Sequence, residues 1–161
     1  MRKIINPYGE LRGYQCFGCS PNNVHGLQMQ FFEDGEDIVS IWSPRSRFQG
    51  YKDILHGGIQ ATLMDEIASW CVQIRMKTVG VTSNLEIRYR KPVYTTDDKI
   101  TLRSRILEVR RNLVDIQVEL YNGRDELCAE GMATYFTFKR EVAERNFHFP
   151  DYKRFFEDQN A

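Results

Sequence analysis

The sequence lacks the features that place a chain in a membrane or on a nucleic acid. Its 161 residues contain no apolar run long enough to cross a bilayer, and the N-terminal "MRKIINPYGELRGYQC" lacks the apolar core of a signal peptide. The 22 basic and 22 acidic residues balance, so no broad attraction to nucleic acids or anionic membranes is expected. These absences predict a soluble, cytoplasmic protein with no nucleic-acid or membrane partner.

Cysteine is also scarce, with four residues that we expect to be reduced in the cytoplasm. Cys16 and Cys19 form a C-x-x-C pair in "CFGCSPNNVHGL". A zinc site usually needs four ligands, but only His25 lies nearby, and Cys71 and Cys128 are distant in the sequence. No strand pattern leads into the pair, as a thioredoxin-like redox motif would require. The sequence therefore predicts no metal site and favours a tight turn before the first strand.

The chain has neither internal repeats nor a low-complexity linker, which predicts a single domain over residues 1–161. An N-terminal turn segment, 1–25, precedes two strands around an acidic turn at Glu33–Glu36. A long helix over 57–76, four further strands and a short helix over 150–159 follow. One helix cannot cover both faces of a parallel sheet, so we predict an α+β fold with a mostly antiparallel sheet wrapped on the helix.

The long helix is apolar almost all round, yet it carries two adjacent acids. At about 100° per residue, one apolar arc is predicted to face the sheet, with Glu66 at its edge: Ile59, Leu63, Ile67, Trp70 and Ile74. The opposite face is built from smaller residues that permit close approach: Ala61, Asp65, Ala68 and Val72. We therefore expect the sheet on one side of the helix and a second partner on the other.

The helix begins at His56-Gly57-Gly58. The first N–H groups of a helix lack internal partners, and the helix dipole adds partial positive charge there. Glycine allows a ligand to approach this backbone closely, so that the helix start could stabilise an oxyanion. The alternative is an ordinary Gly-Gly bend before a helix.

The stretch "GYKDILHGGIQATLMDE" resembles the signature of hotdog-fold acyl-CoA thioesterases, in particular the PaaI-like branch of the 4-hydroxybenzoyl-CoA thioesterase superfamily. "CFGCSPNNVHGL", "FQGY" and "LEIRYRKPV" are similar to segments of the same group, and the likeness runs from residue 16 to 138. The resemblance implies a hotdog fold, with a curved antiparallel sheet around one long central helix. It also implies hydrolysis of an acyl-CoA thioester without a cofactor, by a homodimer or a dimer of dimers (homotetramer).

The resemblance assigns roles to individual positions. Gly57, with Gly58 beside it, matches the residue whose N–H polarises the thioester carbonyl, and His56 matches a residue that orients the thioester. Thr82 matches a hydroxyl that places the attacking water, with its neighbour Ser83 as the other possibility. Some relatives carry Asn six residues before the His, where this chain has Gly50; the adjacent Gln49 is the possible substitute.

Asp65 matches the catalytic carboxylate, as a general base on water or as a nucleophile; the sequence leaves both open. Its neighbour Glu66 is the second candidate. The basic residues after the helix are candidates for binding the CoA phosphates: Arg88, Arg90 and Lys91.

Gly57 and Asp65 lie about 12 Å apart along the helix axis, because each residue adds roughly 1.5 Å. One thioester carbon cannot touch both, so we expect the two groups to come from different copies of the helix in a two-fold dimer. A non-catalytic acyl-CoA sensor is the alternative, and an enoyl-CoA hydratase is a third. The acid at position 65 favours hydrolysis. The aromatic-rich C-terminal segment is expected to pack on the sheet or on a neighbouring subunit.

Overall fold

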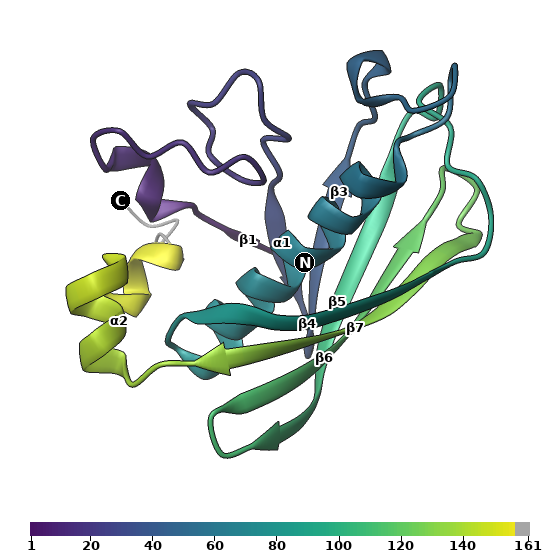
Figure 1. Ribbon diagram of the computed structural model, residues 1–161. Helices are drawn as coiled ribbons and strands as arrows, with labels where there is room; N and C mark the ends of the chain where they lie inside the picture. Colours follow the sequence, from purple (N-terminus) through teal and green to yellow (C-terminus); the bar gives the residue numbers. More distant parts are fainter. Residues whose placement is uncertain (157–161) are drawn as a thin grey trace.

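Seven strands in the described residues, 1–156, form one sheet in the order β1-β2-β3-β5-β6-β7-β4. The structure is a computed structural model, and Figure 1 shows the sheet curving around the long helix α1. The strands are β1 (Arg2–Ile4), β2 (Phe31–Asp34), β3 (Asp37–Trp42), β4 (Gly80–Tyr89), β5 (Ile100–Arg110), β6 (Leu113–Tyr121) and β7 (Leu127–Thr137). Every neighbouring pair is antiparallel, which confirms the predicted α+β class and the sheet around one central helix.

The central helix α1 spans Gly57–Met76, the same range as in the sequence prediction. It begins after His56, whose side chain caps the first turn, and it ends where Lys77 adopts a left-handed conformation with φ 54°. That conformation cannot continue the helix, because it turns the chain out of the hydrogen-bonding pattern. No helix in residues 1–156 is long and apolar enough to span a membrane.

α1 is covered on both sides within one protomer. The neighbours predicted for its two faces were therefore wrong in part. Ala68 and Val72, which we expected to meet a second partner, are completely buried by this chain itself. Trp70 packs against β2, next to the edge strand β1, and against the chain termini, with Phe31 at 4.6 Å and Phe155 at 5.8 Å between ring centroids. A helix that is buried nearly all round has no polar stripe, so its sequence does not fix which apolar side meets the sheet.

The terminal segments hold more structure than the sequence predicted. The segment 1–25 was expected to be a turn region, yet it contains β1, which pairs with β2, and a 3₁₀ helix η1 (Pro7–Glu10). A second 3₁₀ helix, η2 (Ser46–Phe48), precedes α1. Three residues are too few to show a strand periodicity, so β1 left no signal.

The C-terminal helix predicted over 150–159 is wrong in extent. An unpredicted helix α2 (Arg140–Phe147) comes first, and the later segment contains only the 3₁₀ helix η3 (Tyr152–Phe155). Residues 157–159 of the prediction lie outside the described residues.

The C-terminal aromatics pack on α1 and on the N-terminal segment, not on the central sheet. Phe155 is completely buried, and its carbonyl accepts a hydrogen bond from the Ile5 amide at 2.8 Å. The Tyr152 hydroxyl donates to the Ile74 carbonyl of α1 at 3.1 Å. The two ends of the chain therefore meet over the side of α1 that the central strands leave free (Figure 1).

Phe155→Ala is expected to lower the free energy of unfolding by about 3–5 kcal/mol, the usual cost of removing a buried phenyl ring. Urea unfolding followed by intrinsic fluorescence would measure the change. Phe147→Ala is the matched control, because Phe147 is 38% exposed and should cost far less. Equal stability of the two variants would show that the C-terminal packing contributes nothing.

Candidate active site

In the first turn of α1, the amide of Gly58 is capped, and the amides of Gly57 and Ile59 have no acceptor within residues 1–156. His56 Nδ1 accepts a hydrogen bond from the Gly58 N–H at 2.9 Å. Because Nδ1 is an acceptor, the proton of the neutral imidazole lies on Nε2 and is available as a donor. The N–H of Gly57 has no hydrogen-bond acceptor within residues 1–156. Gly57 therefore presents the free donor that the sequence predicted, whereas the amide of Gly58 is already used by the cap.

Asp65 is held by two hydroxyl groups. Thr82 Oγ1 donates to Asp65 Oδ1 at 2.8 Å, and Tyr135 Oη lies 2.6 Å from the same oxygen. Burial and the Asp65 carboxylate raise the pKa of Tyr135, so its phenol stays protonated and donates. Both contacts use Oδ1, and Oδ2 has no partner among the described residues. Asp65 is thus a fixed carboxylate, partly exposed, with one oxygen free for water or substrate.

A β-bulge places Thr82 beside Asp65. The pairing of β4 with β7 matches Thr82 to Tyr135 and Asn84 to Thr134, so Ser83 is the extra residue. If the strand continued regularly through Ser83, without a bulge, alternation would put Thr82 on the face opposite Leu85 and Ile87, which pack toward the core. The bulge turns Thr82 toward α1, as bulges near functional sites often do. Ser83 itself lies exposed beside this contact.

The strand β4 connects the two ends of the site. At its far end, the Tyr89 hydroxyl donates to the carbonyl of Gly57 at 2.7 Å. Along β4, Thr82 therefore lies beside Asp65, and Tyr89 lies beside the start of α1. β4 is the last strand of the sheet, and within the described residues its outer edge has no partner. Both halves of the site thus lie along one free edge of the sheet.

A groove of about 390 Å³ lies beside the helix start. Its walls include Phe48, Gln49, His56, Gly58 and Thr62. A side chain at Gly50 would place its Cβ 3.3 Å from the His56 ring, so glycine at this position lets His56 sit close to the preceding loop. The Gln49 side-chain oxygen accepts from the Asp53 amide at 2.9 Å, and so the side chain braces this loop.

Glu66 faces away from Asp65 and does not join the site around Thr82. Its Oε1 lies 3.5 Å from Cys16 Sγ and accepts from Trp70 Nε1 at 3.3 Å. Burial, followed by the nearby Cys16, raises the pKa of Glu66 to about 7. The two adjacent acids of α1 therefore lie in different surroundings, on different sides of the helix.

The basic residues predicted to bind CoA phosphates are mostly paired with acids. Arg90 forms an ion pair with Glu130, and Lys91 forms one with Glu126 at 3.2 Å. Strand alternation places Arg88 and Arg90 on the outer face of the sheet, opposite Tyr89. The structure does not bring these three residues to the helix start.

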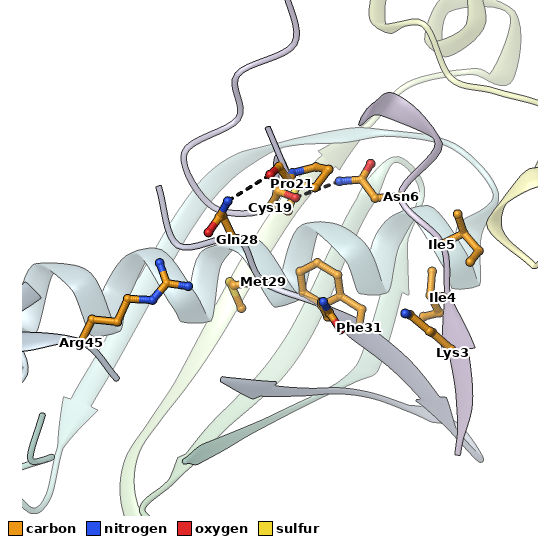
Figure 2. Close-up of a pocket in the computed structure, with 11 residues that line it drawn as sticks. Lys3, Ile4, Ile5, Asn6, Cys19, Pro21, Gln28, Met29, Phe31 and Arg45 are labelled. Atoms are coloured by element: carbon orange, nitrogen blue, oxygen red, sulfur yellow. Dashed lines mark hydrogen bonds between the residues drawn. The ribbon is translucent and has the colours of Figure 1, made fainter. Parts of the chain in front are cut away.

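A separate pocket of about 440 Å³ lies between the N-terminal segment and the residues that lead into β2 (Figure 2). It is lined by residues such as Asn6, Cys19, Gln28, Phe31 and Arg45, and none of its residues belongs to α1. It is therefore distinct from the Asp65 site.

Two tyrosines of the site were missed by the sequence reasoning. Tyr135 lies 70 residues after Asp65, and its partner on α1 becomes visible only through the register of β7. Tyr89 was assigned no role from the sequence, although its hydroxyl contacts the Gly57 carbonyl. A tyrosine within a strand is usual, so neither position carried a signal of function.

Comparisons with known proteins find thioesterases and esterases. The family model for the thioesterase superfamily matches residues 52–129. A provisionally named esterase of Saccharolobus solfataricus is 29% identical over 123 residues, which cover 76% of this chain and 80% of that protein.

Solved structures share the fold. A Streptococcus mutans protein bound to acetyl-CoA superposes with a TM-score of 0.66 at 19% identity, covering 81% of this chain and 98% of that one. The Escherichia coli PaaI protein, from the phenylacetic acid degradation operon, gives a TM-score of 0.64 at 15% identity, covering 71% and 82%. The chain has the hotdog fold, and its residues 52–129 match the thioesterase superfamily model.

Proposed function

We propose that this protein is a thioester hydrolase that cleaves acyl-CoA thioesters to the free acid and CoA. The observation that carries the proposal is Asp65, whose Oδ1 is fixed by Thr82 and Tyr135 while Oδ2 stays free beside an open sheet edge. The acetyl-CoA bound to the Streptococcus mutans structure supports an acyl-CoA ligand. The PaaI likeness supports placement in the PaaI-like branch.

Asp65 acts on the thioester in one of two ways. As a general base, Oδ2 takes a proton from water while the water oxygen bonds to the thioester carbon. As a nucleophile, the carboxylate bonds to that carbon and forms a mixed anhydride, which water then hydrolyses. In both routes the C–S bond breaks and CoA leaves as a thiolate that takes up a proton. Thr82, with Ser83 beside it, is suited to holding the attacking water.

The helix start supplies the opposite half of the site. The open N–H of Gly57 stabilises the oxyanion that forms on the thioester carbonyl, and the dipole of α1 adds partial positive charge. The Nε2–H of His56 donates to the substrate and orients it. The groove beside His56 and Gly58 holds part of the acyl-CoA, with Gln49 fixing its wall.

A homodimer, or a dimer of dimers, completes the site. A free strand edge is a surface that proteins normally pair or protect, and β4 offers ten residues of it, with one bulge at Ser83. If two copies of β4 pair antiparallel so that Thr82 lies opposite the partner's Tyr89, Asp65 approaches the partner's Gly57. The two-fold symmetry then creates two equivalent sites.

Among the candidate phosphate ligands, Arg88 remains the strongest. Arg90 and Lys91 have carboxylate partners within the chain, which a CoA phosphate would have to displace. Glu66 is not placed at the reacting carbon, because its carboxylate contacts Cys16 and Trp70.

The proposal is tested by incubating the protein with a panel of short-chain, long-chain and aromatic acyl-CoAs and trapping the released thiol. We expect release of CoA from at least one class, with kcat/KM in the usual enzyme range of about 10⁴ M⁻¹s⁻¹ or more. Tight binding without any thiol release would instead support the acyl-CoA sensor.

A further inference from the structure

A second cluster of reactive side chains lies on the other side of α1. The Sγ atoms of Cys16 and Cys19 and a carboxylate oxygen of Glu66 all lie within 4.8 Å of one another. Cys19 is buried and Cys16 is partly exposed. The thioesterase proposal uses none of these three groups, and the sequence alone predicted no metal here, because Glu66 comes from a distant part of the chain.

The two cysteines sit on a rigid turn. The Leu27 amide donates to the Phe17 carbonyl at 2.7 Å, and the Met29 amide donates to the Gly18 carbonyl at 2.9 Å. The side chain of Asn6 donates to the Cys19 carbonyl at 2.9 Å (Figure 2). These bonds fix the backbone on both sides of the pair, so the two thiols are positioned before any ligand binds.

Gly18 allows Glu66 to reach the thiols. A Cβ at position 18 would lie 2.6 Å from the Glu66 carboxylate, a distance that real side chains do not adopt. The turn and α1 are therefore packed against each other at this one point, with a carboxylate between them.

The cluster gathers three groups that can each act as an anionic metal ligand, and it has no counter-ion. No basic side chain within residues 1–156 forms an ion pair with Glu66; its side-chain hydrogen bonds are to Cys16 and Trp70. Shielded charges are normally paired or bound to a metal, because leaving them uncompensated is costly.

We propose that Cys16, Cys19 and Glu66 bind one zinc-class divalent ion, which fastens the N-terminal segment to α1. With bond lengths of roughly 2.3 Å to sulfur and 2.0 Å to oxygen, a tetrahedral ion sets its S and O ligands about 3.5 Å apart. The Cys16 Sγ to Glu66 Oε1 distance is 3.5 Å. Binding releases the two thiol protons to solvent, and a water molecule takes the fourth position.

Neighbouring groups are placed to support the ligands. Tyr14 Oη lies 3.1 Å from Cys19 Sγ, within hydrogen-bonding distance of this ligand. Trp70 donates to Glu66 from the next turn of α1. Such outer contacts orient metal ligands and tune their affinity.

The test uses full-length protein without a metal-binding tag, stripped with a chelator and kept reduced. Titration with Co²⁺ should bind about one ion per chain and produce thiolate charge-transfer absorption and the intense visible bands of a tetrahedral site. Zn²⁺ should displace Co²⁺ and raise the melting temperature. Cys16→Ser, Cys19→Ser and Glu66→Gln should each weaken binding at least roughly tenfold.

Cys128→Ser is the matched control, because Cys128 is buried but lies outside the cluster. It should bind Co²⁺ with unchanged affinity and spectrum. Gly18→Ala tests positioning, since it keeps all three ligands but pushes Glu66 away; we expect weaker binding with the thiolate bands retained. Absence of thiolate bands, or equal Co²⁺ affinity in a Cys16→Ser/Cys19→Ser double variant, would overturn the proposal. Loss of acyl-CoA hydrolysis alone would not affect it, because the readout is metal binding.

Discussion

Asp65→Asn is expected to lower turnover of the best acyl-CoA substrate roughly 10²-fold or more, the usual scale for a positioned general base. The amide can still accept hydrogen bonds from Thr82 and Tyr135 through its oxygen, so the local structure should survive. Its nitrogen, however, neither takes a proton nor attacks a carbonyl. Steady-state hydrolysis gives kcat, and binding of a non-hydrolysable acyl-CoA thioether measures affinity separately. Affinity should stay close to that of the unmodified protein.

The adjacent acid is the matched control for this experiment. Glu66→Gln changes the same chemical group one residue further along α1, but on the side that contacts Cys16 and Trp70. It should lose much less turnover than Asp65→Asn. A larger loss from Glu66→Gln, or full activity in Asp65→Asn, would show that the wrong carboxylate was assigned.

The sequence predicted the fold well where local signals were strong. The Gly-Gly start of α1 and the apolar alternation of β6 are local patterns, so both elements could be predicted without knowing their neighbours. The sequence did not predict which face of α1 packs on the sheet, because Trp70 and Val72 are equally compatible with burial against the sheet or against the termini. Burial of Val72 within the protomer shows that the chain itself supplies a cover that we had assigned to a partner.

The residues of the candidate site also fall into those that the sequence could predict and those that it could not. Gly57 and Asp65 were accessible from the sequence because they lie on one helix at a fixed spacing. The contact of Tyr135 with Asp65 depends on the pairing of β4 with β7 and on one extra residue, Ser83, in the bulge. The Cys16–Glu66 contact likewise depends on how the N-terminal turn docks on α1. Such contacts between distant residues are determined by tertiary packing and leave no periodic pattern in the sequence.

Gly57→Pro is expected to lower turnover roughly 10²- to 10³-fold, the scale for losing one oxyanion donor. Proline removes the N–H and little else at this position, because it is favoured at the first residue of a helix. The preceding His56 has ψ 133°, which a following proline accepts. A Cβ at this position meets Tyr89 at an ordinary 3.7 Å. Gly57→Ala keeps the N–H and should lose far less activity; equal losses in the two variants would contradict the oxyanion role.

Mixing the two inactive variants tests whether each site is shared between protomers. A heterodimer of Asp65→Asn with Gly57→Pro carries both changes in one site and neither in the other. Random assembly makes about half of the dimers mixed, so co-expression should restore roughly a quarter of the unmodified activity. The measurement is hydrolysis by the co-expressed mixture, and by the mixed dimer purified through two different affinity tags, which should reach roughly half of the unmodified activity, beside each parent homodimer. If Asp65 and Gly57 instead acted within one chain, every protomer in the mixture would keep one defect and activity would stay at the level of the parents. Recovery therefore requires that the carboxylate of one chain and the helix start of the other work on the same thioester.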